Sequence, residues 1–175
     1  MSTRYARTQA EKIVERLGMA AKLPIDVKLI ARNLGLKVIE ANLGPGVSGL
    51  LISNGKAAQI CVHEDDASVR QRFTIAHEIG HHALGHQLES GEHVLVDKGY
   101  YISERGPRAS HGVDSKEIEA NQFAGSLLMP LRLIREKVAE LGGSPLLDSD
   151  VTELAQAFGV SEQAMTIRLG GLRLL

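Results

Sequence analysis

Hydrophobic residues in the first third of the chain predict two helices followed by a small sheet. They recur at helical spacing up to Gly18, and Asp26 is a suitable N-cap for a shorter helix that Gly35 closes. Farther along, two β-prone runs flank Asn54-Gly55, the strongest short-range signal for a β-hairpin. We therefore predict helices over 4–18 and 26–34, then strands over 36–40, 48–53 and 57–63.

Helical spacing dominates the remainder of the chain. Pro130 separates two predicted helices, and residues 142–145 form a Gly-Gly-Ser-Pro linker. The predicted elements are helices over 67–84, 115–129, 131–141, 150–158 and 161–169, and a short strand over 93–96. Helices, a small sheet and further helices in this order indicate an α+β fold. We expect a main domain over 1–145 and a small helical appendage over 146–175.

Composition narrows the class of protein. Hydrophobic residues make up 43% of the 175 residues, and the net charge of −1 excludes the basic field of a general nucleic-acid binder. Cys61 is the single cysteine, which excludes a disulfide framework and suits a reducing compartment. Apolar runs are shorter than the roughly 20 residues of a membrane helix, and the charged N-terminus is unlike a signal peptide. We expect a cytoplasmic protein without membrane association.

The segment His77-Glu78-Ile79-Gly80-His81 contains a His-Glu-x-x-His motif inside the helix predicted over 67–84. Residues four apart on a helix are neighbours, with about 5–6 Å between Cβ atoms, so both imidazoles can reach one tetrahedral zinc. Glu78 lies beside them and can reach water at the metal without being a ligand. Zinc lowers the pKa of water toward about 7, so this carboxylate is the candidate general base.

Gly80 lies in the middle of the apolar stripe that borders the two motif histidines. A glycine inside a helix costs about 0.8–1.0 kcal/mol relative to alanine. Close approach of another helix is a physical reason for that cost, and such a helix could deliver a third ligand. A catalytic zinc usually has three protein ligands and an open fourth position.

Other histidines near the motif are poorer ligands. The class of site with a third histidine six residues after His81 is excluded, because that position is Gln87. His86 lies one residue earlier than this class of site requires. His82 points about 100° away from its neighbour on the helix, so it cannot share the same metal comfortably.

A carboxylate from the helix predicted over 115–129 is the remaining source of a third ligand. Glu117 falls within the apolar stripe of that helix and Glu119 points away from it, so the helical period favours Glu117 and keeps Glu119 as the alternative. Asn121 follows Glu117 by four residues, and from there its side chain could orient one ligating histidine.

Two stretches together resemble the ImmA/IrrE family of metalloproteases: RQRFTIAHEIGHHALGH at 70–86 and EIEANQFAGSLLMP at 117–130. Residues 23–38 and 48–53 are similar to the N-terminal portion of that family, and the likeness covers residues 20–170. The resemblance implies a zincin-like core, with a small sheet beside the active-site helix.

The resemblance also implies a site and a substrate. The site is of the gluzincin type, with Zn²⁺ bound by His77, His81 and Glu117, and with Glu78 as base. The implied substrates are DNA-binding repressors, often helix-turn-helix proteins of the Xre type, which are cleaved or otherwise inactivated under stress or on phage or mobile-element induction.

Residues 150–169 have the spacing of a helix-turn-helix around Gly159-Val160-Ser161. The would-be recognition helix carries Arg168 as its only basic residue, with Glu162 near its start. Phosphate contacts need more positive charge than that. We expect a structural or partner-binding role for this segment, and not direct DNA binding.

Further candidates lie outside the motif helix. The loop over 91–114 separates the two metal-binding segments, so we expect it to border the cleft. Cys61 lies in a strand-like run and is expected to be a small buried hydrophobe. The candidates for stabilising the oxyanion of a tetrahedral intermediate are His63, His93, His111, Tyr100 and Tyr101.

Two hypotheses of different class follow. The first is a zinc endopeptidase that acts on a protein partner. The alternative is a non-proteolytic transcriptional regulator or antitoxin-like binding protein with a structural or vestigial metal site. The complete set of two histidines, a third ligand and a base favours the enzyme, because a structural zinc needs no base and usually has four protein ligands. The pattern leaves the scissile bond and the oligomeric state open.

Overall fold

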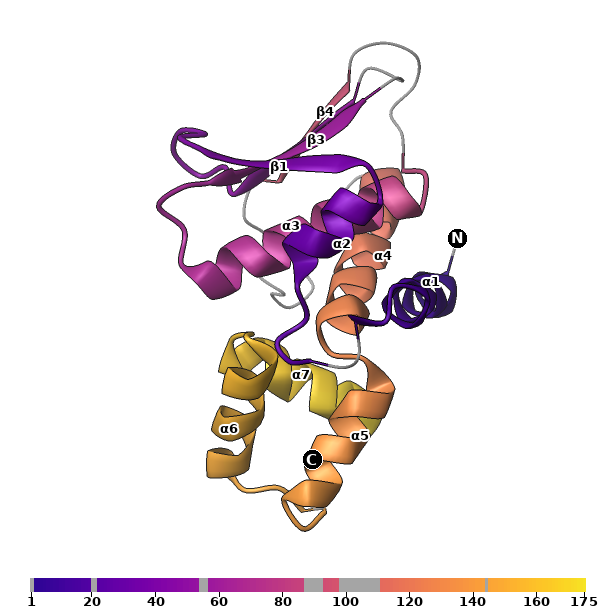
Figure 1. Ribbon diagram of the computed structural model, residues 1–175, viewed down its shortest axis with the longest axis vertical. Helices are drawn as coiled ribbons and strands as arrows, with labels where there is room; N and C mark the ends of the chain where they lie inside the picture. The colour runs from indigo at the N-terminus through magenta and orange to yellow at the C-terminus, as the bar shows by residue number, and fades with distance from the viewer. Residues whose placement is uncertain (1, 20–21, 54–56, 87–92, 98–110, 144) are drawn as a thin grey trace.

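The fold is described from a computed structural model of the chain, and the structure describes all residues except 1, 20–21, 54–56, 87–92, 98–110 and 144. The described residues form seven helices and four strands, which are shown in Figure 1. The helices are α1 (Thr3–Arg16), α2 (Val27–Asn33), α3 (Ser68–Ala83), α4 (His111–Leu128), α5 (Leu131–Glu140), α6 (Asp148–Phe158) and α7 (Glu162–Leu172). The strands are β1 (Leu36–Ala41), β2 (Gly49–Ser53), β3 (Ala58–His63) and β4 (His93–Asp97).

Every predicted helix and strand has a counterpart here, so the α+β fold class is confirmed. The ends differ by a few residues. Helix α7, for example, continues beyond Leu169 through two glycines and ends where Arg173 takes a left-handed conformation, with a φ of 58°. Asp26 caps α2 as predicted, with its side chain accepting a hydrogen bond from the backbone N–H of Leu29.

The strands form one mixed sheet in the order β1-β3-β2-β4. Strands β2 and β3 pair antiparallel, with Leu51 opposite Ile60, as the predicted hairpin requires. Strand β1 runs parallel to β3, and β4 runs antiparallel to β2. One face of this sheet covers α3, the helix that carries the His-Glu-x-x-His motif (Figure 1).

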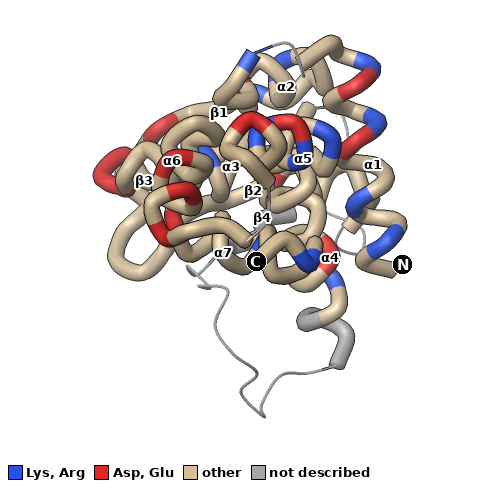
Figure 2. Tube along the Cα trace, turned by 90° about the horizontal axis from the view of Figure 1, so that it is seen from below, with Lys and Arg blue, Asp and Glu red and all other residues tan. Residues whose placement is uncertain are grey.

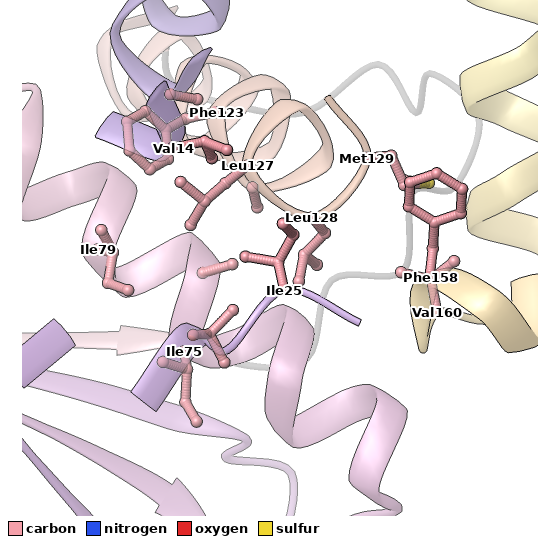
Figure 3. Close-up of a cluster of buried hydrophobic side chains, with 14 of the residues drawn as sticks. Val14, Ile25, Ile75, Ile79, Phe123, Leu127, Leu128, Met129, Phe158 and Val160 are labelled. Carbon is pink, nitrogen blue, oxygen red and sulfur yellow. The ribbon is translucent and has the colours of Figure 1, made fainter. Parts of the chain in front are cut away.

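The hydrophobic core lies between the sheet, α3 and α4, and it continues toward the C-terminal helices (Figure 3). Ile75 and Ile79 of α3 and Phe123 of α4 are buried there. At the far end, Phe158 and Met129 belong to the same cluster of buried side chains. None of the described helices is long and apolar enough to cross a membrane.

Helices α3 and α4 approach each other closely at Gly80. A Cβ at this position would lie 3.1 Å from Cδ1 of Phe123 and 3.3 Å from the Cα of Ala120. These distances are tighter than ordinary van der Waals contacts of a Cβ, so a larger residue at this position would have to push the two helices apart by a few tenths of an ångström. The prediction that Gly80 marks the approach of another helix is confirmed, and that helix is the one that carries Glu117.

The replacement Gly80→Ala is expected to destabilise the protein by about 1–2 kcal/mol, although alanine is the better helix former. Overpacking costs about 1–3 kcal/mol and outweighs the propensity gain, because the Ala120 backbone cannot yield as a flexible side chain would. The matched control is Gly125→Ala in α4, where the new methyl group would meet only the end of Met129 at 4.0 Å. That variant is expected to gain about 0.5–1 kcal/mol. Urea denaturation measures the change in the free energy of unfolding for both variants. Equal changes in Gly80→Ala and Gly125→Ala would contradict the proposed helix contact.

Two arginines connect the C-terminal helices to the rest of the protein. Arg72 of α3 donates from Nε to the carbonyl of Gly159 at 3.0 Å and from Nη2 to the carbonyl of Phe158 at 3.3 Å. Arg168 of α7 donates from Nε and Nη2 to the carbonyl of Met129, at 3.1 and 2.9 Å. The residues after 145 thus share hydrogen bonds and core with those before it. The division of the chain into two domains at this point stays a prediction.

Arg168 is buried, and its environment bears on the helix-turn-helix hypothesis. Burial lowers the pKa of this guanidinium to about 10, although Glu11 opposes the effect. The one basic residue of the would-be recognition helix is therefore turned into the protein. Figure 2 shows acidic and basic residues interspersed, and not a broad basic patch, over the visible described residues. A helix-turn-helix function of α6 and α7 stays a prediction, and the buried arginine argues against phosphate contact through α7.

The replacement Arg168→Met is expected to lower the free energy of unfolding by about 1.5–3 kcal/mol, the range for a hydrogen bond to a charged group. The buried carbonyl of Met129 loses both donors in this variant. The exposed control Arg135→Met is expected to change stability by less than about 0.5 kcal/mol. Chemical denaturation compares the two, and an Arg168→Met protein as stable as the wild type would mean that this arginine does not anchor α7.

Candidate metal centre

The motif residues of α3 are buried because the sheet covers one side of the helix and α4 packs on another (Figure 1). His77, Glu78 and His81 are 4%, 1% and 2% exposed. Strand β2 comes close to this helix at Gly49, where any Cβ would overlap the methyl group of Thr74. This glycine lets the sheet approach the helix one turn before the motif.

The predicted ligands converge from two helices. Nε2 of His77 lies 2.9 Å from Nε2 of His81. The carboxylate of Glu117 lies 3.1 Å from Nε2 of His77 through Oε2 and 3.3 Å from Nε2 of His81 through Oε1. Around a tetrahedral zinc with bonds of about 2.0–2.1 Å, neighbouring ligand atoms are about 3.3–3.4 Å apart. The spacing of these three groups therefore fits a single metal ion, and they form a cluster that could hold one.

The two candidate carboxylates of α4 have different neighbours. Glu117 faces both motif histidines, and its side chain is 31% exposed. Glu119 is buried, and its Oε2 lies 3.0 Å from Nε2 of His86. The geometry agrees with the choice of Glu117 over Glu119, while its binding of a metal stays a prediction.

Contacts at Nδ1 orient the rings of the two motif histidines, on the side opposite the Nε2 atoms that face Glu117. Nδ1 of His77 lies 2.9 Å from Oδ1 of Asn121, which is the orienting contact expected four residues after Glu117. Nδ1 of His81 lies 3.2 Å from Nδ1 of His86. An N–H at Nδ1 leaves the lone pair at Nε2 for a metal. The amide oxygen of Asn121 favours this tautomer of His77, and the contact with His86 is compatible with the same tautomer of His81.

The electrostatics of the cluster also favour metal-binding forms. Burial raises the pKa of Glu117, but the hydrogen bonds from His77 and His81 outweigh it and hold this pKa far below the ordinary value. Burial lowers the pKa of His81, although Glu117 opposes this effect. At neutral pH the carboxylate is therefore ionised and the imidazole of His81 is neutral, which are the protonation states of metal ligands.

The remaining sequence candidates lie elsewhere. Nδ1 of His63 accepts a hydrogen bond from the backbone N–H of Asp65, in the loop after β3. Cys61 is buried in β3, as expected. The side chains of His93, Tyr100, Tyr101 and His111 lie outside the described residues, so their roles as oxyanion stabilisers stay predictions. The sequence did not predict the contact of His86 with Glu119 or with His81.

The fold and the site together are consistent with a zincin-like metallopeptidase. Three features support this class: a helix with the His-Glu-x-x-His motif, a carboxylate from a second helix, and a small sheet over the first helix. A family model described as the IrrE N-terminal-like domain, Peptidase_M78, matches residues 31–170, so the chain belongs to this family of metallopeptidases. A comparison with curated proteins found no match. The resemblance drawn from residues 70–86 and 117–130 is confirmed.

Proposed function

We propose that the protein is a zinc-dependent endopeptidase that cleaves or inactivates a DNA-binding repressor. The observation that carries the proposal is the convergence of His77, His81 and Glu117 beside Glu78, in a chain that belongs to a metallopeptidase family. Two imidazole nitrogens and one carboxylate oxygen suit zinc and leave room for a fourth group. When bound, zinc supplies Lewis-acid chemistry that polarises a carbonyl and acidifies water.

The protein residues then have separate tasks. His77, His81 and Glu117 hold the ion, and Asn121 fixes the ring of His77 through Nδ1. The carboxylate of Glu78 takes a proton from the attacking water and passes it to the leaving amine. Burial of Glu78 in a low-dielectric environment strengthens its interaction with positive charge at the site.

Two observations weigh against the alternative of a non-proteolytic regulator with a structural metal. Structural zinc usually has four protein ligands. Among the residues that the structure describes, the candidate metal-binding cluster has three, and the proposed base Glu78 directly follows His77 in the chain. In addition, the basic residue that α7 would offer to DNA is buried against Met129.

The proposed substrate is a helix-turn-helix repressor of the Xre type, and the proposed setting is a cytoplasmic response to stress, phage or mobile elements. The support is the family resemblance. The near-neutral charge supports action on a protein partner, since it gives the enzyme no electrostatic attraction to DNA of its own.

The test uses the full chain and, as the candidate substrate, a helix-turn-helix repressor of the Xre type. The apo protein, the zinc-reconstituted protein and the zinc-reconstituted protein with excess chelator are each incubated with that repressor, and mass spectrometry identifies the products. Cleavage at a defined bond only in the zinc-reconstituted sample supports the proposal. A zinc-loaded protein that binds the repressor and releases it from DNA without cleavage would instead favour the non-proteolytic alternative.

A further inference from the structure

His86 is brought back to the metal-binding helix by the turn that ends α3. Gly85 has a φ of 66°, a left-handed conformation that favours glycine. The backbone N–H of His86 then bonds to the carbonyl of His81 at 3.0 Å, and that of Gly85 bonds to the carbonyl of His82 at 3.2 Å. These two bonds form a Schellman motif, which sets His86 beside the last turn of the helix.

The side chain of His86 bridges two residues of different helices. Its Nδ1 lies 3.2 Å from Nδ1 of His81, and its Nε2 lies 3.0 Å from Oε2 of Glu119. All three side chains are buried, so water does not compete strongly for these hydrogen bonds. The result is a continuous row from Glu119 through His86 to His81, whose Nε2 faces Glu117.

The chemistry of the row selects one arrangement of protons. A carboxylate accepts hydrogen bonds, so Nε2 of His86 carries the proton that faces Glu119. In a neutral imidazole, Nδ1 of His86 is then an acceptor, and Nδ1 of His81 must donate to it. Neutral His81 with its proton on Nδ1 has a free lone pair on Nε2, the atom directed at the metal cluster.

The arrangement requires the neutral form of His86, whose Nδ1 carries no proton. A protonated His86 would present an N–H to Nδ1 of His81 and would remove the acceptor that the row requires.

We propose that His86 and Glu119 are positioning residues that fix the tautomer and ring orientation of His81 as a metal ligand. The proposal rests on the proposed metal site, and it assigns to His81 the support that Asn121 gives to His77. Ligating histidines generally donate their other N–H to a carboxylate or carbonyl, and loss of such a partner costs about 10–100-fold in metal affinity. Here a second histidine transmits the effect of the carboxylate.

The first experiment reads the protons directly in the wild-type protein. Long-range ¹H–¹⁵N NMR spectra of the apo and zinc-loaded full chain distinguish the two tautomers of each histidine. We expect His81 to carry its proton on Nδ1 and His86 to carry its proton on Nε2. A spectrum with the proton of His86 on Nδ1 would overturn the proposal.

The second experiment measures zinc affinity by competition with a chromogenic chelator. The variant His86→Leu is expected to weaken zinc binding about 10–100-fold, because His81 loses its acceptor. The variant His86→Gln is expected to stay within about threefold of the wild type, since its amide oxygen can accept from His81 and its N–H can donate to Glu119. The control His82→Leu alters the adjacent, half-buried histidine and is expected to bind zinc like the wild type.

A further variant keeps the test decisive if His86→Leu does not fold. Glu119→Gln preserves the shape of the side chain and replaces a charge-assisted hydrogen bond with a weaker neutral one. We expect the zinc affinity of Glu119→Gln to fall between those of His82→Leu and His86→Leu. If His86→Leu does not fold, we expect the zinc affinity of Glu119→Gln to be lower than that of His82→Leu. Circular dichroism of each apo variant establishes folding.

The outcomes separate this proposal from the proposed function. If folded His86→Leu binds zinc with wild-type affinity, the positioning role is overturned, even in an active protease. Equal losses of zinc affinity in His86→Leu and His86→Gln would overturn it as well. If the wild type binds zinc but cleaves no repressor, the proposed function fails, while the order of zinc affinities still tests the role of His86 and Glu119.

Discussion

Glu78→Gln is expected to slow peptide-bond cleavage by about 10²–10⁴-fold, the usual contribution of a general base. Glutamine has nearly the same shape as glutamate, so the packing around this buried position is retained. Its amide cannot take a proton from water, and that is the step assigned to Glu78. Because Glu78 is not one of the three convergent candidate ligands, zinc binding is expected to persist.

The measurement is a cleavage assay on the repressor with zinc content determined on the same samples. Glu64→Gln is the matched control, because it removes an exposed carboxylate in the loop before α3 and is expected to cleave at the wild-type rate. Unchanged cleavage by Glu78→Gln would eliminate the enzymatic mechanism proposed for this site. Loss of zinc together with activity would instead indicate that Glu78 supports the metal site.

Glu117→Gln is expected to weaken zinc binding by more than the roughly 100-fold that loss of an orienting partner can cost. The carboxylate supplies the negative charge of the cluster and faces Nε2 of both His77 and His81. An amide of the same shape keeps the position of an oxygen atom but has no charge to offset that of the ion. Cleavage is expected to be lost in parallel at limiting zinc.

Chelator competition measures the affinity, and Glu153→Gln, an exposed position on α6, is the matched control. Wild-type zinc affinity in Glu117→Gln would mean that the third ligand lies elsewhere. Restored cleavage at high zinc would fit a ligand whose loss only lowers occupancy, whereas inactivity at full occupancy would assign Glu117 a part in the chemistry itself.

Local features of the sequence were sufficient to predict much of the fold. The helical period located α3 and α4, and Asn54-Gly55 predicted that β2 and β3 pair as a hairpin. Gly80 predicted a close helix contact, because a glycine inside a helix needs a reason that outweighs its propensity cost. These signals act over a few residues, so they can be read without knowledge of the tertiary structure.

Long-range relations were beyond the same approach. The parallel pairing of β1 with β3 depends on how the chain crosses the sheet, which periodicity does not determine. The contact of His86 with Glu119 depends on the turn at Gly85 and on the alignment of α3 with α4. The glycine after the helix was a usable signal for the turn, but the partner on α4 emerges only when both helices are placed.

Arg168 illustrates why residue type alone misleads at the C-terminus. Taken along the sequence, it is the one cation on a helix with recognition-helix spacing. In the folded chain it donates to the carbonyl of Met129, at the residue that follows α4. The cation therefore donates hydrogen bonds to a backbone carbonyl at the end of a helix. The periodicity of the sequence does not predict this role.

The hydrogen bonds of Arg72 have a practical consequence for anyone who wishes to make a minimal protease. Its guanidinium donates hydrogen bonds to the carbonyls of Phe158 and Gly159, so a fragment that stops at residue 145 would remove both of these acceptors from α3. Such a fragment would also uncover Met129 and the apolar side chains around it. Active material is therefore to be sought in the intact chain, and shortened forms are expected to aggregate.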